Sequence, residues 1–284
     1  MSAATSAKLH SLEVEPLAGA IGAVITGVDL ADLDDATVAE IRRIWLEHLV
    51  VFFRGQELDA DAFLAFARRI GEPVRYPFLQ GFDTHPEIIE VAKLPNETVN
   101  FGGIWHSDTV YLEQPPMGTM LLAREIPPFG GDTMFANMYA AYEALSPALR
   151  EVLDGLAAVN SSALADVSKT REDRMRDHGS AEDEQHFLST HPVVRTHPET
   201  GRKALYVNRA HTASFAGMTE DESRPLLEYL FQHSIRPEFT CRFQWEVGSL
   251  ALWDNRCAMH NPINDYQGFT RRMHRITLGG DTPR

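Results

Sequence analysis

Short apolar runs separated by turn-forming residues dominate the chain, and only a few longer stretches repeat apolar residues at helical spacing. The run from Leu49 to Phe53 is apolar throughout and has the length of a buried strand. Helical spacing occurs over 36–48, after an aspartate pair that can cap a helix, and again over 60–69 before Gly71. Further short strands are predicted within 12–30 and at 88–91, 117–124, 192–194, 204–207, 239–243, 249–253 and 275–278.

Two more helix starts are visible in the second half of the chain. The serine–proline pair at 146–147 places a capping residue before a proline at the first helical position. Thr219 and Glu222 have the spacing of a capping box. Because proline lacks an N–H and clashes inside a helix, Pro225 favours a regular helix only over 223–232.

Many short strands with a few helices predict a mainly β protein with flanking helices, of the α+β class, built as a double-stranded β-helix or jelly roll. No internal repeat or linker divides the chain, so we expect residues 1–284 to form a single domain. Residues 1–10 are expected to be a loose tail. The segment 164–188 is dense in charged residues and predicts a loop, with a mobile lid over a site as its functional alternative.

Composition narrows the classes of partner. The chain has 40 acidic and 26 basic residues and a formal net charge of −14, which argues against a nucleic-acid binder or a protein that binds anionic membranes. Two cysteines are too few for a disulfide framework. No apolar run is long enough to span a membrane, and the first residues do not resemble a signal peptide. The sequence therefore predicts a cytoplasmic protein.

The candidate chemistry begins at His106 and Asp108. Residues two apart on a strand point to one face, so an imidazole and a carboxylate would project together. Two histidines and one carboxylate are the ligands that hold non-haem Fe(II) and leave positions open for small molecules. His260, far downstream, is the candidate for the second histidine.

Five motifs occur in order along the chain: Trp105-His106-Ser107-Asp108, Gly130-Gly131-Asp132-Thr133, Trp253-Asp254-Asn255-Arg256 followed by His260, Asn264-Asp265-Tyr266, and Arg271-Arg272-Met273-His274-Arg275. In order and spacing they resemble the taurine dioxygenase-like (TauD/TfdA) family of Fe(II)- and 2-oxoglutarate-dependent dioxygenases. The resemblance covers nearly the whole chain from Leu12 onward. It implies hydroxylation of a small substrate by O₂, with 2-oxoglutarate converted to succinate and CO₂.

The resemblance also implies roles for individual residues. His106, Asp108 and His260 correspond to the iron ligands, and these three are the predicted catalytic and metal-binding residues. Arg271 corresponds to the arginine that binds the distal carboxylate of 2-oxoglutarate, for which a permanently charged guanidinium is suited. The family places a hydroxyl at Thr133 to assist at that carboxylate. The family counterpart of Arg275 lies near the iron and meets the anionic head of the prime substrate. Arg275 is therefore predicted to bind both cofactor and substrate, beside the cofactor-binding Thr133 and Arg271.

Strand geometry agrees with part of this assignment. An even number of residues separates Arg271 from Arg275, so on a strand both share a face, while His274 and Arg272 point the other way. We therefore expect His274 to be structural and Arg272 to face solvent. Related halogenating enzymes have a small residue in place of the carboxylate, so Asp108 predicts hydroxylation.

The predicted substrate pocket departs from that of the taurine enzymes. Gly102 stands where they have an asparagine, and His211 stands where they have a phenylalanine. Taurine would therefore be poorly paired, but Arg275 still predicts an anionic substrate. We expect a sulfonate, an alkyl sulfate ester or an aryloxyalkanoate, whose hydroxylated product collapses to a carbonyl compound if the carbon bears sulfur or oxygen. The candidate pocket residues are Tyr76, Tyr111, His211, Arg275 and Arg75.

Two other functions use similar residues. A cupin-like metal-dependent hydrolase or isomerase would also need histidine and aspartate ligands, but it has no need for Arg271 and Thr133. A non-catalytic binding protein with the same fold is disfavoured by the complete ligand set. The resemblance further implies a homo-oligomer, a dimer or a tetramer.

Overall fold

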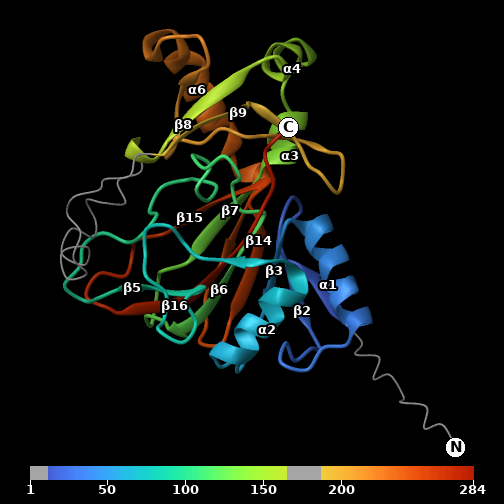
Figure 1. Ribbon diagram of the computed structural model, residues 1–284, viewed down its shortest axis with the longest axis vertical. Coiled ribbons are helices and arrows are strands. Elements are labelled where there is room, and N and C mark those ends of the chain that lie inside the picture. Colours follow the sequence, from blue (N-terminus) through green and yellow to red (C-terminus); the bar gives the residue numbers. More distant parts are fainter. Residues whose placement is uncertain (1–11, 165–186) are drawn as a thin grey trace, which may run out of the picture.

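The computed structural model describes residues 12–164 and 187–284, in which two mostly antiparallel sheets lie face to face (Figure 1). The larger sheet has the strand order β1-β2-β3-β14-β6-β16-β4, and β5 also pairs with β16. Its strands are β1 (Glu13–Pro16), β2 (Ala23–Thr26), β3 (Val50–Phe53), β4 (Pro73–Val74), β5 (Ile88–Lys93), β6 (Gly118–Glu125), β14 (Leu250–Asp254) and β16 (Arg271–Leu278).

The smaller facing sheet has the order β13-β7-β15, formed by Thr240–Phe243, Thr133–Asn137 and Ala258–Pro262. Phe52 of β3 joins the two sheets. Its ring stacks on Phe243 at 3.9 Å and meets Phe135 edge-on at 5.5 Å between centroids. All three rings are fully buried, so the main core lies between the sheets. The predicted double-stranded β-helix is confirmed.

Helices α1 (Asp35–His48) and α2 (Ala60–Ile70) cover the outer face of the large sheet (Figure 1). Each is preceded by an N-cap aspartate, Asp34 or Asp59, whose side chain accepts a backbone N–H of the first turn. Their buried faces pack on the strand side chains that point away from the facing sheet, in a second apolar cluster that includes Trp45, Phe63 and Leu252. Both helices agree with the apolar spacing of the sequence.

A third group of elements gathers at the top of Figure 1, beyond the ends of the two sheets. It contains a three-stranded sheet of order β12-β8-β9 and the hairpin β10–β11. Its strands and the helices around it are α3 (Met138–Glu143), α4 (Pro147–Asp154), β8 (Ala157–Ser161), η1 (Ser162–Leu164), β9 (Leu188–Pro192), β10 (Val194–Thr196), β11 (Lys203–Leu205), β12 (Thr212–Phe215), α6 (Glu220–Ser234) and η2 (Pro237–Phe239).

Several element boundaries differ from the sequence prediction. The predicted strand at 192–194 is divided by a bend at Val193 between β9 and β10, and two other differences have a clear cause. Helix α6 starts at Glu220 rather than at 223, with Pro225 inside it. The capping box forms completely, since Thr219 accepts from the Glu222 N–H and the Glu222 carboxylate accepts from the Thr219 N–H at 2.8 Å. This cap holds the first turn, so the helix tolerates the missing proline N–H. Strand β16 starts at Arg271 rather than at 275, because its first half pairs with β5.

Two other expectations concern the segments beyond these elements. The predicted tail at 1–10 and nearly all of the predicted loop or lid at 164–188 lie outside the described residues, and the single-domain expectation stays a prediction. Among the described residues, no helix has the length and apolar character needed to cross a membrane.

Candidate active site

Two of the predicted ligands, His106 and His260, are directly paired in an isolated antiparallel bridge. The His106 N–H donates to the His260 carbonyl at 3.0 Å, and the His260 N–H donates to the His106 carbonyl at 2.8 Å. Residues paired in this way project their side chains to the same side. The two imidazole centroids accordingly lie 4.2 Å apart, and both side chains are buried.

The prediction that His106 and Asp108 share a strand is wrong. His106 forms only an isolated bridge, and Asp108 begins a turn in which Thr109 has a φ of 41°. The turn is anchored by a side chain instead of a strand partner, because the Asp108 N–H donates to Asn255 Oδ1 at 3.3 Å. The carboxylate still reaches the histidines. Asp108 Oδ1 lies 3.6 Å from His106 Nε2 and 3.9 Å from His260 Nε2.

The donor atoms of this cluster suit a metal ion. His106 Nδ1 donates to the Ile104 carbonyl at 2.6 Å, which leaves the lone pair of Nε2 facing Asp108. One ligand atom from each of His106, Asp108 and His260 lies within 4.8 Å of the other two. Two neutral imidazoles and one carboxylate are the donor set of non-haem Fe(II) sites. The residues therefore fit the metal expected from the sequence.

Asp108 is fully buried and stays ionised. Burial alone would raise its pKa, but the positive charge of Arg275 and the interactions with His260 and His106 outweigh burial and hold the pKa well below its usual value. The nearest cationic atom is Arg275 Nη2, 3.0 Å from Oδ1. The other oxygen, Oδ2, accepts a hydrogen bond from the Thr119 hydroxyl at 2.6 Å. A charged ligand is thus available without a deprotonation step.

A series of hydrogen bonds between buried side chains leads to the Asp108 carboxylate through the Thr119 hydroxyl. The Thr119 hydroxyl accepts from Asn255 Nδ2 at 2.9 Å, and Asn255 Oδ1 accepts from the Trp253 indole N–H at 3.0 Å. Trp253 itself packs against the His260 ring, with 4.7 Å between centroids. The motif from Trp253 to Asn255 therefore orients two of the three candidate ligands.

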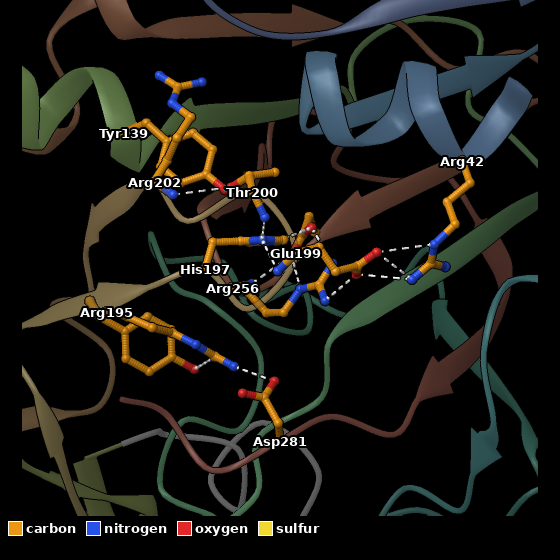
Figure 2. A network of polar contacts seen from close by, with 11 residues as sticks. Arg42, Tyr139, Arg195, His197, Glu199, Thr200, Arg202, Arg256 and Asp281 are labelled. Carbon is orange, nitrogen blue, oxygen red and sulfur yellow. Dashed lines mark hydrogen bonds and ion pairs between the residues drawn. The ribbon is translucent and has the colours of Figure 1, made fainter. Parts of the chain in front are cut away.

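A second buried network contains His197, Glu199 and Arg256 (Figure 2), and it is joined by Asp254, which lies between Trp253 and Asn255. Asp254 accepts from His197 Nε2 at 3.0 Å and from Arg256 Nη2 at 2.7 Å. Arg256 also contacts Glu199, which binds Arg42 of α1 on its other side. The network fastens the β10–β11 turn and α1 to the end of β14.

His197, Asp254 and Cys257 of this network also lie close enough together to hold a metal ion. His197 Nδ1 accepts the backbone N–H groups of Glu199 and Thr200, so Nε2 carries the proton that Asp254 accepts. Burial raises the pKa of the Cys257 thiol well above its ordinary value. Both nitrogens of His197 are engaged and Cys257 is a thiol rather than a thiolate, so we assign this cluster a structural role.

Alternating burial along β16 places the two predicted arginines on its inner face, as expected. Arg271 and Arg275 are buried, whereas Arg272 and His274 are half-buried on the opposite face. Arg272 contacts Glu90 at 2.7 Å, and the His274 ring meets Phe82 edge-on. The expectation of a structural His274 agrees with this placement, while Arg272 lies in an ion pair at the surface.

Arg271 is a buried cation with an unused hydrogen-bond donor among the described residues. Its Nε donates to the Gly131 carbonyl at 3.1 Å, and its Nη2 has no hydrogen-bond partner among the described residues. Gly131 has a φ of +72°, and a Cβ there would lie 3.2 Å from Arg271 Cδ, so glycine permits the close approach. Thr133 lines the same cavity and accepts from Trp245 Nε1 at 3.0 Å, which leaves its own proton free to donate. This arrangement suits a carboxylate.

The cavity extends from the histidines to Arg271, with Arg275, Leu121 and Val91 along its walls. Beside His106 stands a group of rings in which neighbouring centroids lie 5.0–6.3 Å apart, formed by Tyr76, Phe78, Phe101, Tyr111, Phe187 and His211. The Arg275 guanidinium lies 4.9 Å from the centroid of Tyr76. The site therefore combines the cationic Arg275 with a neighbouring aromatic surface.

Three of the predicted pocket residues lie in this ring group, namely Tyr76, Tyr111 and His211. Burial and the nearby His106 lower the pKa of His211 to about 3, so its imidazole is neutral, and its Nδ1 has no hydrogen-bond partner among the described residues. Of the ring group, Phe101 lines the cavity. Arg75 is exposed and belongs neither to the ring group nor to the cavity lining.

Sequence reasoning missed several residues of the site. Phe78, Phe101 and Phe187 lie in loops, where no periodicity indicates which way a side chain points. Thr119 was hidden within an apolar strand. The available signal was modest: each phenylalanine lies in a polar loop, where a large apolar side chain is uncommon unless it is buried by tertiary contacts.

Comparison with known proteins agrees with this geometry. The family model described as taurine catabolism dioxygenase TauD, TfdA family matches residues 13–277. An alpha-ketoglutarate-dependent sulfate ester dioxygenase of Pseudomonas putida is 36% identical over 286 residues, covering 99% of this chain and 93% of that protein. An (S)-phenoxypropionate/alpha-ketoglutarate-dioxygenase of Sphingobium herbicidovorans is 33% identical, covering 95% of this chain and 96% of that protein.

A solved structure shows the same fold. The crystal structure of a taurine dioxygenase from Burkholderia xenovorans superposes with a TM-score of 0.81 at 39% identity, covering 96% of this chain and 92% of that one. The family match spans all the motifs quoted above, from the first candidate ligand to Arg275. The chain belongs to the TauD/TfdA family of alpha-ketoglutarate (2-oxoglutarate)-dependent dioxygenases.

Proposed function

We propose that this protein is an Fe(II)- and 2-oxoglutarate-dependent dioxygenase that hydroxylates a small anionic organic substrate. His106, Asp108 and His260 hold the iron, and Arg271 with Thr133 binds the distal carboxylate of 2-oxoglutarate. The observation that carries the proposal is that one cavity contains both the ligand cluster and the spare donor of a buried arginine.

When bound, the iron supplies the oxidation of substrate by O₂, coupled to conversion of 2-oxoglutarate to succinate and CO₂. The residues of the chain supply geometry and charge. The His106–His260 bridge fixes the spacing of the imidazoles, and the Thr119 hydroxyl fixes the carboxylate of Asp108. The apolar walls exclude water from the reacting carbon.

The prime substrate proposed has an anionic head and an apolar body. Arg275 lies on the cavity wall between Asp108 and the ring group, so it can attract an anionic head while the rings contact the rest. Among the described residues that line the cavity there is no carboxylate to pair with an ammonium group. This favours an alkyl sulfate ester or an aryloxyalkanoate over taurine, with other sulfonates retained as candidates. On a carbon bearing oxygen, hydroxylation leads to collapse into a carbonyl compound.

The two alternative functions predict other behaviour. A cupin-like hydrolase or isomerase would turn over without 2-oxoglutarate, and a binding protein would not consume it. Neither accounts for a buried cation such as Arg271 beside the ligand cluster. The family membership also disfavours both.

The test is an anaerobic titration of the purified protein with Fe(II) and 2-oxoglutarate, followed by absorbance spectroscopy. The Fe(II)–2-oxoacid chelate has a weak visible charge-transfer band, and a bound prime substrate shifts it. We expect the band to appear with the wild type and not with Asp108→Ala. Sulfonates, sulfate esters and aryloxyalkanoates are then added in turn. A metallated wild type with no band would reject the dioxygenase proposal.

Two further expectations belong to the proposal. We place the protein in the cytoplasm, which is supported by two buried cysteines, Cys241 and Cys257, that are both free. We also propose a dimer or tetramer. Light scattering coupled to size-exclusion chromatography measures the assembly, and a monomer at micromolar concentration would contradict it.

A further inference from the structure

Lys93, which the assigned roles leave unused, lies beside Arg271 on the inner face of the barrel. It ends β5, and the antiparallel register pairs it directly with Arg271 of β16. Directly paired residues share a face, with their Cβ atoms about 5 Å apart. The next inward pair along the two strands is Val91 with Met273, and Val91 lines the cavity. Lys93 therefore shares an inward face with the predicted 2-oxoglutarate arginine, beside the residues that line the cavity.

The burial of Lys93 is unusual for a lysine at the end of a strand. The residue is 3% exposed, and its Nζ is buried with no hydrogen-bond partner among the described residues. Lysine is rarely buried in full unless it is paired, because an ammonium loses its hydration inside a protein. The group that faces it is the ring of Tyr266, with 4.5 Å from Nζ to the centroid.

Arg271 and Lys93 approach the same ring. A Cβ on Gly131 would lie 3.2 Å from Arg271 Cδ and 3.3 Å from Tyr266 Cδ1, so the arginine stem and the tyrosine ring both pack on this glycine. Two buried cations at one place repel each other, and an anion bound between or beside them relieves the repulsion.

The two aspartates nearest this glycine both face Arg242, while Asp132 Oδ1 is buried without a hydrogen-bond partner among the described residues. Asp132 accepts from Arg242 at 2.6 Å, and Asp265 accepts the Gly131 N–H at 2.7 Å while also facing Arg242 at 3.5 Å. Their charge is shared with a third cation, so the pocket keeps positive character for a ligand.

We propose that Lys93 is a second cationic residue of the 2-oxoglutarate site, adding its charge to that of Arg271 where the distal carboxylate binds. The inference rests on the proposed function, and it deepens that function by assigning selectivity. Two positive charges beside the cavity favour a 2-oxo diacid over a 2-oxo monoacid of the same length. Lys93 contributes to binding of the co-substrate and does not contact the reacting atoms.

The experiment compares two ligands in each protein. Fe(II)-loaded wild type, Lys93→Met and Lys93→Arg are titrated without oxygen by calorimetry, with 2-oxoglutarate and with 2-oxopentanoate, which lacks the distal carboxylate. We expect Lys93→Met to weaken 2-oxoglutarate binding by about tenfold or more, since removing one partner of a buried charge pair costs at least that factor. Binding of 2-oxopentanoate should stay within about twofold of wild type, because it has no group for the lost charge to attract.

The matched control is Arg272→Met, which removes a cation from the adjacent position on the outer face of the same strand. It should leave both affinities unchanged, and Lys93→Arg should restore most of the 2-oxoglutarate affinity. If Lys93→Met does not fold, Lys93→Gln is measured instead, and the ratio of the two affinities within that one protein decides. An unchanged ratio would overturn the role of Lys93. A wild type that binds neither acid would instead reject the proposed function.

Discussion

The hydroxyl of Thr119 offers a sharp test of how Asp108 is held. Thr119→Val keeps the shape of the side chain but removes a 2.6 Å hydrogen bond to a buried carboxylate. It also leaves Asn255 Nδ2 without its acceptor. A hydrogen bond to a charged group contributes about 1.5–3 kcal/mol, and an unsatisfied buried amide costs about 1–3 kcal/mol. We expect the free energy of unfolding of the metal-free protein to fall by about 3 kcal/mol.

The same change should weaken Fe(II) binding by about 10- to 100-fold, the usual effect of losing a group that orients a metal ligand. Thr277→Val is the matched control, because Thr277 pairs with Thr119 across the sheet and its buried hydroxyl has no hydrogen-bond partner among the described residues. Denaturant unfolding measures stability, and anaerobic titration with Fe(II) measures affinity. If the two variants bind Fe(II) equally well, Thr119 does not orient Asp108.

Two other predictions follow from single positions. Gly102 has a φ of +70°, and a Cβ there would lie 2.9 Å from His106 Cε1. Gly102→Ala should therefore displace the His106 ring and weaken Fe(II) binding about tenfold or more. The control is Gly217→Ala, at a φ of +80° with open space around it, which should lower stability alone. Burial and the charge of Arg124 lower the pKa of His274 to about 4 from 6.5. The unfolded chain therefore takes up the proton first as pH falls, and the wild type should lose stability relative to His274→Gln between about pH 6.5 and 4. Thermal unfolding at both pH values checks this, and parallel pH profiles would contradict it.

Much of the fold was predictable because its elements have strong local signals. The run from Leu49 to Phe53 forms a strand because it is buried on both faces, by the facing sheet and by the two outer helices. The start of α6 was mispredicted because two local rules conflict there. The capping box satisfies several groups of the first turn, whereas Pro225 removes a single N–H, so the cap prevails.

The candidate ligands were predictable, but the geometry that brings them together was not. The i, i+2 rule requires a continuous strand, and the chain leaves the strand after a single bridge at His106. Asp108 reaches the histidines because Asn255 and Thr119 hold its backbone and its carboxylate. These contacts depend on where β6 and β14 lie, which no local pattern encodes.

Three pairings of the site join strands or turns that are far apart in sequence. His106 pairs with His260, Lys93 pairs with Arg271, and Thr119 pairs with Trp253. From the sequence alone, Lys93 at the end of an apolar strand would be expected in solvent, and Thr119 within an apolar strand would be expected to serve only packing. Only the register indicates the proposed roles, the lysine in a cationic wall and the threonine beside a candidate ligand. Because register in a jelly roll is set by long-range pairing, a one-residue slip would turn these side chains to the opposite face. The sheet pairing therefore determines the chemistry of the site as strongly as the ligands do.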